Sequence, residues 1–155
     1  MRLFIALLAG TLLLTGCFKE KSAEPDVIPP TPQYPWRFEV GTQSYIGAVE
    51  SIQVDSVAGA AVMTISGVDT VGKGRISLSI TGTDLVPGTY KSPSASFVYT
   101  EDLNTIYQSV NGADSFAITI NSISSSQVTG SFTGSIRSLS GGTTKLSNGS
   151  FSGLR

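Results

Sequence analysis

The amino-acid sequence predicts an all-β protein, either an antiparallel β-sandwich or a small β-barrel of about 8–10 short strands. Three observations predict this fold class. Many short segments alternate apolar and polar residues, which is the period of a half-buried strand. Turn-forming residues separate these segments, and the 155-residue chain contains 17 glycines. After the first 35 residues, no segment repeats apolar residues with the 3.6-residue period of an amphipathic helix.

The alternation and the turn residues place each strand along the chain. Trp36, Phe38 and Val40 alternate with charged residues and form the first predicted strand. Eight to ten strands are predicted in this way, at residues 36–40, 44–54, 60–65, 75–81, 88–91, 96–100, 115–121, 128–136 and 144–151, with apolar residues at 106–107 following an acidic turn.

Several glycines predict local features. Gly47, inside the second strand, indicates a bulge or a close approach between backbones. Residues 67–74 contain three glycines and are predicted to form a loop. Asn111-Gly112 is a strong signal for a hairpin turn.

The last two strands share a near-repeat. Gly130-Ser131-Phe132-Thr133-Gly134 recurs as Gly149-Ser150-Phe151-Ser152-Gly153. We expect the two segments to be antiparallel neighbours, each placing one phenylalanine in the core between glycines that leave room for a facing ring.

The N-terminal segment has the pattern of a secretory signal peptide, with Arg2 before an apolar run from residue 3 to 14. This run is shorter than the roughly 20 residues that span a bilayer. The only cysteine follows in Leu14-Thr15-Gly16-Cys17. This stretch resembles the lipobox of bacterial lipoproteins, which implies that Cys17 receives a diacylglycerol thioether and becomes the first mature residue. The alternatives are cleavage by the general signal peptidase and a buried core thiol.

Three regions follow from these patterns: a helical signal peptide at residues 1–16, the lipidated cysteine with a disordered proline-rich tether at 17–35, and a single all-β domain at 36–155. Five of the seven prolines lie between Pro25 and Pro35. Such a segment favours extended polyproline II and serves as a semi-rigid spacer. The alternative is a ligand for a module with an aromatic groove.

Charge and residue types limit the function. Removing the signal peptide leaves nine of the ten basic residues against eleven acidic ones, a net charge of −2 that argues against nucleic acid as a partner. The chain has no histidine, and Cys17 is assigned to lipid, so histidine-based triads and thiol nucleophiles are absent. No nucleotide-binding glycine motif occurs. We therefore expect no enzymatic activity, no cofactor and no metal site.

Two readings of the acidic residues remain as alternatives. A carboxylate pair for glycoside hydrolysis has as its candidates Glu39, Glu50, Asp84, Glu101, Asp102 and Asp114. A calcium site would use the loop oxygens of Asp69, Asp84, Glu101 and Asp102, which lack the spacing of an EF-hand loop.

Aromatic residues give the best indication of ligand binding. Aromatic rings next to hydroxyl-rich neighbours are typical of sites where sugars stack. The candidate ligand-binding residues are Trp36, Tyr45, Tyr90, Tyr99 and Tyr107, with Tyr34 as a further member of such a platform. The alternative for each is a place in the core or at its rim, with the tyrosine hydroxyl reaching solvent.

The whole layout resembles the small, functionally uncharacterised lipoproteins that are common in Bacteroidetes. The matching features are the lipobox, the proline-rich tether, the aromatic first strand over 36–40 with a Gly-x-x-x-Tyr turn at 41–45, Gly88-Thr89-Tyr90, and the Gly-Ser-Phe-Thr-Gly strand with its near-copy. The resemblance implies an all-β domain anchored at the outer membrane and no catalytic residue. Phe18 after the cysteine fits outer-membrane sorting, and the choice between periplasmic and surface face stays open.

These observations together predict a lipid-anchored protein of the cell envelope with a non-enzymatic binding or structural role at the outer membrane. Its expected partners are the membrane, through the N-terminal lipid, and a glycan or an envelope protein. The alternative is a surface carbohydrate-binding module or an accessory subunit of a glycan-uptake system.

Overall fold

The computed structural model describes residues 35–102, 105–112 and 115–155. Ten strands make up this part of the chain: β1 (Pro35–Val40), β2 (Gln43–Val57), β3 (Ala60–Asp69), β4 (Arg75–Gly82), β5 (Gly88–Lys91), β6 (Ala95–Thr100), β7 (Ile106–Ser109), β8 (Phe116–Ile123), β9 (Gln127–Ser138) and β10 (Thr143–Leu154). The described residues contain no helix, and so none that could cross a bilayer. The all-β prediction is confirmed, whereas the predicted signal helix, Cys17 and the tether up to residue 34 lie outside the described residues.

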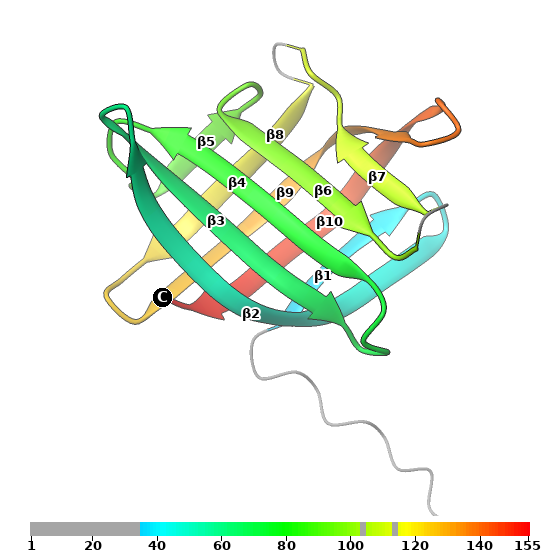
Figure 1. The fold of residues 1–155 in the computed structure, drawn as a ribbon, viewed down its shortest axis with the longest axis horizontal. Helices are drawn as coiled ribbons and strands as arrows, with labels where there is room; N and C mark the ends of the chain where they lie inside the picture. The colour runs from blue at the N-terminus through cyan, green and yellow to red at the C-terminus, as the bar shows by residue number, and fades with distance from the viewer. Residues whose placement is uncertain (1–34, 103–104, 113–114) are drawn as a thin grey trace, which may run out of the picture. The chain divides into compact units, whose positions relative to one another are not determined.

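The strands close into an eight-stranded antiparallel barrel (Figure 1). The ring runs β10-β1-β2-β3-β4-β6-β7-β9, and β9 pairs with β10 to complete it. This last pairing is long, from Thr143 opposite Arg137 to Leu154 opposite Gln127. Of the two predicted architectures, the barrel is therefore the correct one.

β7 and β8 behave as two halves of one interrupted strand along the same edge of β9. Tyr107 pairs with Ser138, and Phe116 pairs with Gly134 further along β9. Ser135 bridges the gap between them, because its carbonyl accepts from the Val110 amide and its own amide donates to Ser115. The predicted hairpin at Asn111-Gly112 is therefore wrong: β7 and β8 do not pair with each other. β5 pairs only with β8 and lies outside the ring.

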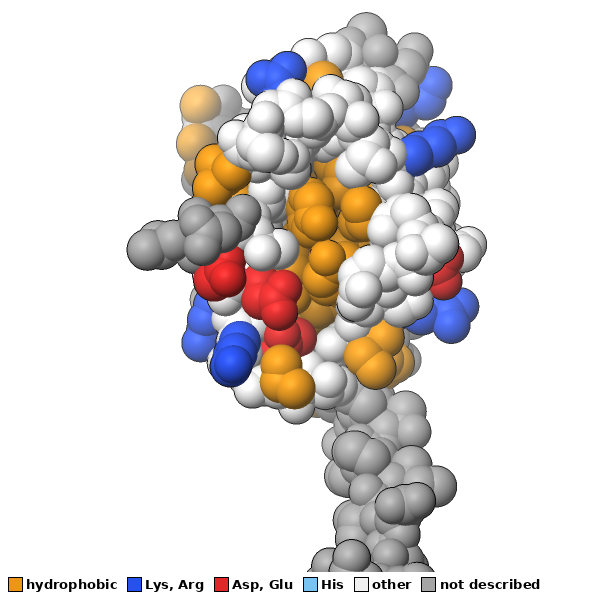
Figure 2. All heavy atoms as spheres, turned by 90° about the vertical axis from the view of Figure 1, so that its right-hand side faces the viewer, with side chains coloured by type: hydrophobic (Ala, Val, Ile, Leu, Met, Phe, Trp, Pro, Cys, Tyr) orange, Lys and Arg blue, Asp and Glu red, His pale blue; other side chains and the backbone are white. Residues whose placement is uncertain are grey.

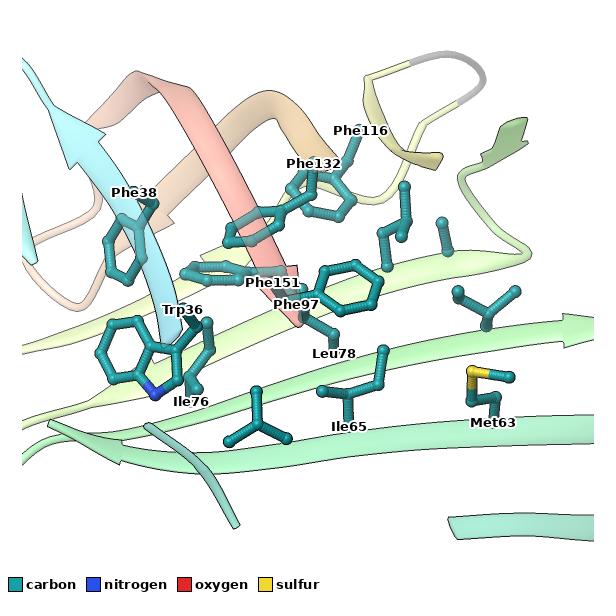
Figure 3. Packing of buried hydrophobic residues seen from close by; sticks show 14 of the residues in the cluster. Trp36, Phe38, Met63, Ile65, Ile76, Leu78, Phe97, Phe116, Phe132 and Phe151 are labelled. Carbon is teal, nitrogen blue, oxygen red and sulfur yellow. The ribbon is translucent and has the colours of Figure 1, made fainter. Parts of the chain in front are cut away.

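The barrel interior is filled by buried side chains from β1, β2, β3, β4, β6, β8, β9 and β10, part of which Figure 3 shows. The alternation of each strand points one side chain in two inward, as in the buried Ile76, Leu78 and Ile80 of β4. Phe97 and Phe132 stack at the centre with ring centroids 5.8 Å apart. An eight-stranded barrel is just wide enough for side chains to fill it, so the interior is a core and leaves binding to the surface and the ends.

The glycine-phenylalanine repeat forms the reciprocal contact that was predicted. β9 and β10 are antiparallel, with Phe132 opposite Gly149 and Phe151 opposite Gly130. A Cβ at Gly130 would lie 2.5 Å from the Phe151 ring, and one at Gly149 would lie 2.6 Å from the Phe132 ring. Each glycine therefore provides the space for the facing ring.

Trp36 likewise needs glycines opposite its ring, one in β2 and one in β3. A Cβ at Gly47 would lie 2.4 Å from its indole, and a Cβ at Gly67 would lie 2.6 Å from its Nε1. The close approach predicted for Gly47 is confirmed. The loop predicted from residue 67 onward is wrong for its first three residues, because β3 continues to Asp69. Gly67 is a strand residue whose missing side chain accommodates the tryptophan.

Candidate functional site

Four connections gather at one end of the barrel because neighbouring strands run in opposite directions. They join β1 to β2, β3 to β4, β6 to β7, and β9 to β10. Figure 2 looks onto this end, where a hollow has hydrophobic side chains in its floor and acidic side chains along one border. An open cleft of about 380 Å³ lies here. We call it the tyrosine cleft and define it by the rings of Tyr45, Tyr99 and Tyr107, the apolar side chains of Ile46 and Val71, and the carboxylates of Asp69 and Glu101.

The three tyrosines come from the ends of three different strands. Tyr45 lies near the start of β2, Tyr99 near the end of β6 and Tyr107 near the start of β7. The ring centroid of Tyr45 lies 5.0 Å from that of Tyr99 and 6.0 Å from that of Tyr107. The hydroxyl oxygens of Tyr45 and Tyr107 are 3.4 Å apart. These contacts fix the rings relative to one another, so the cleft floor is preformed.

The core supports this floor from below. Phe38 stacks on Tyr45 with ring centroids 4.8 Å apart, and meets Tyr99 edge to face at 5.2 Å. Tyr99 is only 1% exposed, whereas Tyr45 and Tyr107 are partly exposed. The tyrosine cleft is therefore the solvent-facing end of the aromatic core, and Tyr45 and Tyr107 are the rings that a ligand can reach.

Burial is the largest cause that raises the pKa of both Tyr45 and Tyr99 above the ordinary tyrosine value of 10.0. For Tyr45, the hydrogen bond with Tyr107 raises the pKa further. For Tyr99, the negative charges of Glu101 and Asp69 do so. The hydroxyls of Tyr45 and Tyr99 therefore stay protonated throughout the physiological pH range.

Asp69 shapes the loop between β3 and β4. Its Oδ1 accepts hydrogen bonds from the backbone amides of Val71, at 3.1 Å, and Lys73, at 2.9 Å. Its Oδ2 accepts from the backbone amide of Gly74 at 2.8 Å. This carboxylate holds the loop that presents Val71 to the cleft, as aspartate side chains commonly do in turns.

The cleft carries negative charge only. Within the part of the chain that the structure describes, Asp69 and Glu101 line it and no lysine or arginine does. Its apolar wall is exposed, since Ile46 is 52% and Val71 is 71% accessible to solvent. The arrangement therefore combines a neutral aromatic floor, an apolar wall and an acidic border.

The structure brings together three of the five predicted ligand-binding residues. Tyr45, Tyr99 and Tyr107 lie in the cleft, and Trp36 and Tyr90 do not. Trp36 is a core residue, 1% exposed, whose Nε1 donates to the Ala48 carbonyl oxygen at 3.0 Å. Tyr90 lies on β5, where its hydroxyl accepts from the Val86 amide and lies 2.9 Å from the Val86 carbonyl oxygen. Tyr34 and Cys17 lie outside the described residues.

Sequence reasoning missed Ile46 and Val71 and considered Asp69 only as a loop oxygen. Ile46 follows Tyr45 in β2, lines the cleft and is exposed although it is apolar. Val71 is an apolar residue in a glycine-containing loop. Both could have been found in the sequence as apolar residues at positions that are expected to face solvent.

The acidic residues considered for catalysis lie on separate elements, except for the neighbours Glu101 and Asp102. Glu39 accepts a hydrogen bond from Asn148, Glu50 pairs with Arg75 at 3.3 Å, and Asp84 lies between β4 and β5. Asp102 lies beside Glu101 after β6, and Asp114 is outside the described residues. Across the described segments, no three acidic side chains gather in a way that could hold a metal ion.

Comparisons of the chain with protein-family models, with curated proteins and with solved structures found no match.

Proposed function

We propose that this protein is a lipid-anchored protein of the cell envelope with a non-enzymatic binding role, and that the tyrosine cleft is its binding surface. The observation that carries the proposal is the preformed aromatic floor of Tyr45, Tyr99 and Tyr107 in an open cleft of about 380 Å³. A volume of this size is typical of sites for small ligands, and the lining combines five aromatic or apolar residues with six polar or acidic ones.

The state of Asp69 supports binding rather than catalysis. Asp69 and Glu101 are the two carboxylates in the cleft, and a hydrolase with paired acids would need both. Both oxygens of Asp69 already accept hydrogen bonds from backbone amides of its own loop. A carboxylate committed in this way is a poor proton carrier or nucleophile, and the chain has no histidine to replace it.

The anchoring part of the proposal rests on the lipobox-like Leu14-Thr15-Gly16-Cys17 and on the prolines that follow it. β1 starts at Pro35 and runs toward the cleft, with Val40 at its far end. A strand of six residues spans about 17 Å. The first described residue, Pro35, therefore lies at the end of β1 that points away from the cleft. The outer membrane is the proposed location, on either face.

Two experiments test the two halves of this proposal. Labelled palmitate should be incorporated into the full chain and not into a Cys17→Ala variant; incorporation that survives the substitution would refute anchoring. For binding, amide spectra of residues 18–155, which retain every described core residue, should respond to a ligand screen at the cleft. Responses that survive a Tyr107→Ala substitution, or that map only to β5, would refute the cleft as the binding surface.

A surface carbohydrate-binding module, or an accessory subunit of a glycan-uptake system, is the second candidate. It is supported by the hydrogen-bonding groups that surround the partly exposed rings: Gln43, Ser44, Thr70 and Thr105. Retention of the domain on a glycan array, abolished by Tyr107→Ala and unaffected by Tyr90→Phe, is the expected result. A complete lack of retention would refute this candidate.

A further inference from the structure

We infer that the tyrosine cleft selects small organic cations, in which an ammonium head is joined to an apolar stem. This inference rests on the proposed binding function and specifies the chemical class of the ligand. It assigns the head group to Glu101 and the aromatic floor, and the stem to Ile46 and Val71.

The charge of the cleft is one-sided. Asp69 and Glu101 line it, and among the described residues at its surface there is no cationic side chain to balance them. The nearest cation of the β3–β4 loop, Lys73, is exposed and does not line the cleft. A cationic ligand would be attracted to this surface, whereas an anionic ligand of the same size would be repelled.

Glu101 is the carboxylate available to a ligand. Asp69 already accepts three backbone hydrogen bonds. Glu101 is exposed, and its backbone amide donates to the Thr105 carbonyl oxygen at 2.9 Å, which holds the residue in the connection after β6. Within the described segments its side chain forms no ion pair, in contrast to Glu50, which pairs with Arg75.

The floor of the cleft favours the same ligand. Tyr45 and Tyr99 are neutral at physiological pH, as tyrosines ordinarily are, and burial raises the pKa of their hydroxyls further. Neutral aromatic rings attract ammonium groups through their quadrupole, by an amount that grows as the site excludes water. The cleft thus presents aromatic rings and a carboxylate to the same head group.

The exposed apolar wall of the cleft is the surface that would contact the apolar stem of the ligand. Ile46 and Val71 both line the cleft, and they are 52% and 71% exposed. The backbone amide of Thr70 donates to the Ile46 carbonyl oxygen at 3.2 Å. This hydrogen bond holds the loop that carries Val71 against the strand that carries Ile46. Covering this wall with an alkyl stem removes apolar surface from water and stabilises the complex.

Three probes with the same stem test the inference: hexylammonium, hexanol and hexanoate. Each is titrated into isotope-labelled protein comprising residues 18–155, and amide shifts locate the site. We expect hexylammonium to bind at the cleft about fivefold more tightly than hexanol, with hexanoate weakest. Added salt should reduce the preference for hexylammonium and leave hexanol binding unchanged.

Matched variants separate the charge from the fold. Glu101→Gln should remove most of the preference for hexylammonium and leave the affinity for hexanol unchanged. Glu50→Gln removes a carboxylate outside the cleft and should leave all three affinities as they are. Unchanged spectra outside the cleft would show that both variants remain folded.

The remaining outcomes overturn the inference in distinguishable ways. Equal binding of the three probes at the cleft, or tighter binding of hexanoate, would refute cation selection and leave the proposed binding surface intact. A glycan that binds the cleft while hexylammonium does not would also refute it and would support the carbohydrate-binding candidate. If neither the probes nor glycans perturb the cleft, the inference and the proposed function both fail.

Discussion

Phe132 occupies the space that a side chain at Gly149 would fill, directly across the β9–β10 ladder. The same relationship holds in reverse between Phe151 and Gly130. Because β9 and β10 form the pairing that closes the barrel, these two glycines permit the closure as well as the packing of the core.

Gly149→Ala should destabilise the protein by about 2–3 kcal/mol. The new Cβ would lie 2.6 Å from the Phe132 ring and even closer to the Phe132 carbonyl oxygen. A side chain could rotate away, but the backbone oxygen belongs to the ladder and cannot. Urea unfolding followed by circular dichroism measures the loss.

Gly142→Ala is the matched control for this change, because its new Cβ would have no neighbour nearer than 3.9 Å. Its effect should be within about 0.5 kcal/mol of wild type. If Gly149→Ala were as mild as Gly142→Ala, the close contact between β9 and β10 would be wrong.

Trp36 should be shielded from solvent and should contribute to stability. It is the only tryptophan in the chain and is 1% exposed, so its emission should be blue-shifted and poorly quenched by acrylamide. Trp36→Phe removes the hydrogen bond to Ala48 and leaves a cavity between Gly47 and Gly67. The expected cost is about 2–4 kcal/mol in the free energy of unfolding. Strong quenching of the wild-type emission would contradict the buried position.

The positions of most strands along the chain could be predicted from the sequence, because the side chains of a β-strand alternate between its two faces. The reciprocal fit of Phe132 and Phe151 was also predictable, since each segment carries its glycines and its ring at fixed spacing. Closure of the barrel could not be predicted, because it depends on which strands pair when they lie far apart in the sequence. Asn111-Gly112 shows the limit: its local preference for a turn holds no information about Ser135, which separates β7 from β8.

The candidate site was predicted in part for a similar reason. Alternation indicates which face of a strand a ring occupies, and so Trp36 and Tyr99 appeared equivalent. The structure distinguishes them by position along the barrel axis: Tyr99 lies near the end of β6, and Trp36 near the start of β1. Tyr90 could not be excluded either, because the place of β5 outside the ring depends on its pairing with β8.

Tyr90→Phe should loosen the segment between β4 and β5 without affecting the tyrosine cleft. The Tyr90 hydroxyl lies 2.9 Å from both the amide nitrogen and the carbonyl oxygen of Val86. Because these bonds are exposed, their loss should cost only about 1 kcal/mol. Hydrogen exchange at the Val86 amide should accelerate, while cleft amides keep their chemical shifts. Unchanged exchange at Val86 would contradict the bridging role of the hydroxyl.

Asp69→Ala should open the β3–β4 loop. Three backbone amides, those of Val71, Lys73 and Gly74, lose their acceptor. Two of the three can turn to water, so we expect a loss of about 1–3 kcal/mol and faster hydrogen exchange at all three amides. Asp69→Asn retains one oxygen acceptor and should lie between the alanine variant and wild type. Equal stability of all three proteins would show that the loop does not depend on this carboxylate.

Tyr45 and Tyr99 should make the protein lose stability above pH 10. Burial raises the pKa of both hydroxyls above their ordinary value of 10.0. Between that value and their folded-state pKa, the native protein keeps protons that the unfolded chain releases. Stability therefore falls as the pH rises, by up to about 1.4 kcal/mol per pH unit for each group, and is unaffected by these groups at neutral pH.

Alkaline unfolding with tyrosinate absorbance as a second probe measures this effect. In the folded protein, Tyr45 and Tyr99 should resist ionisation, and Tyr99→Phe should make the loss of stability with pH less steep. Glu101→Gln should lower the pKa of both tyrosines, because its negative charge contributes to raising them. If all five tyrosines of the chain ionised together near their ordinary value while the protein stayed folded, the burial of Tyr45 and Tyr99 in the cleft floor would be wrong.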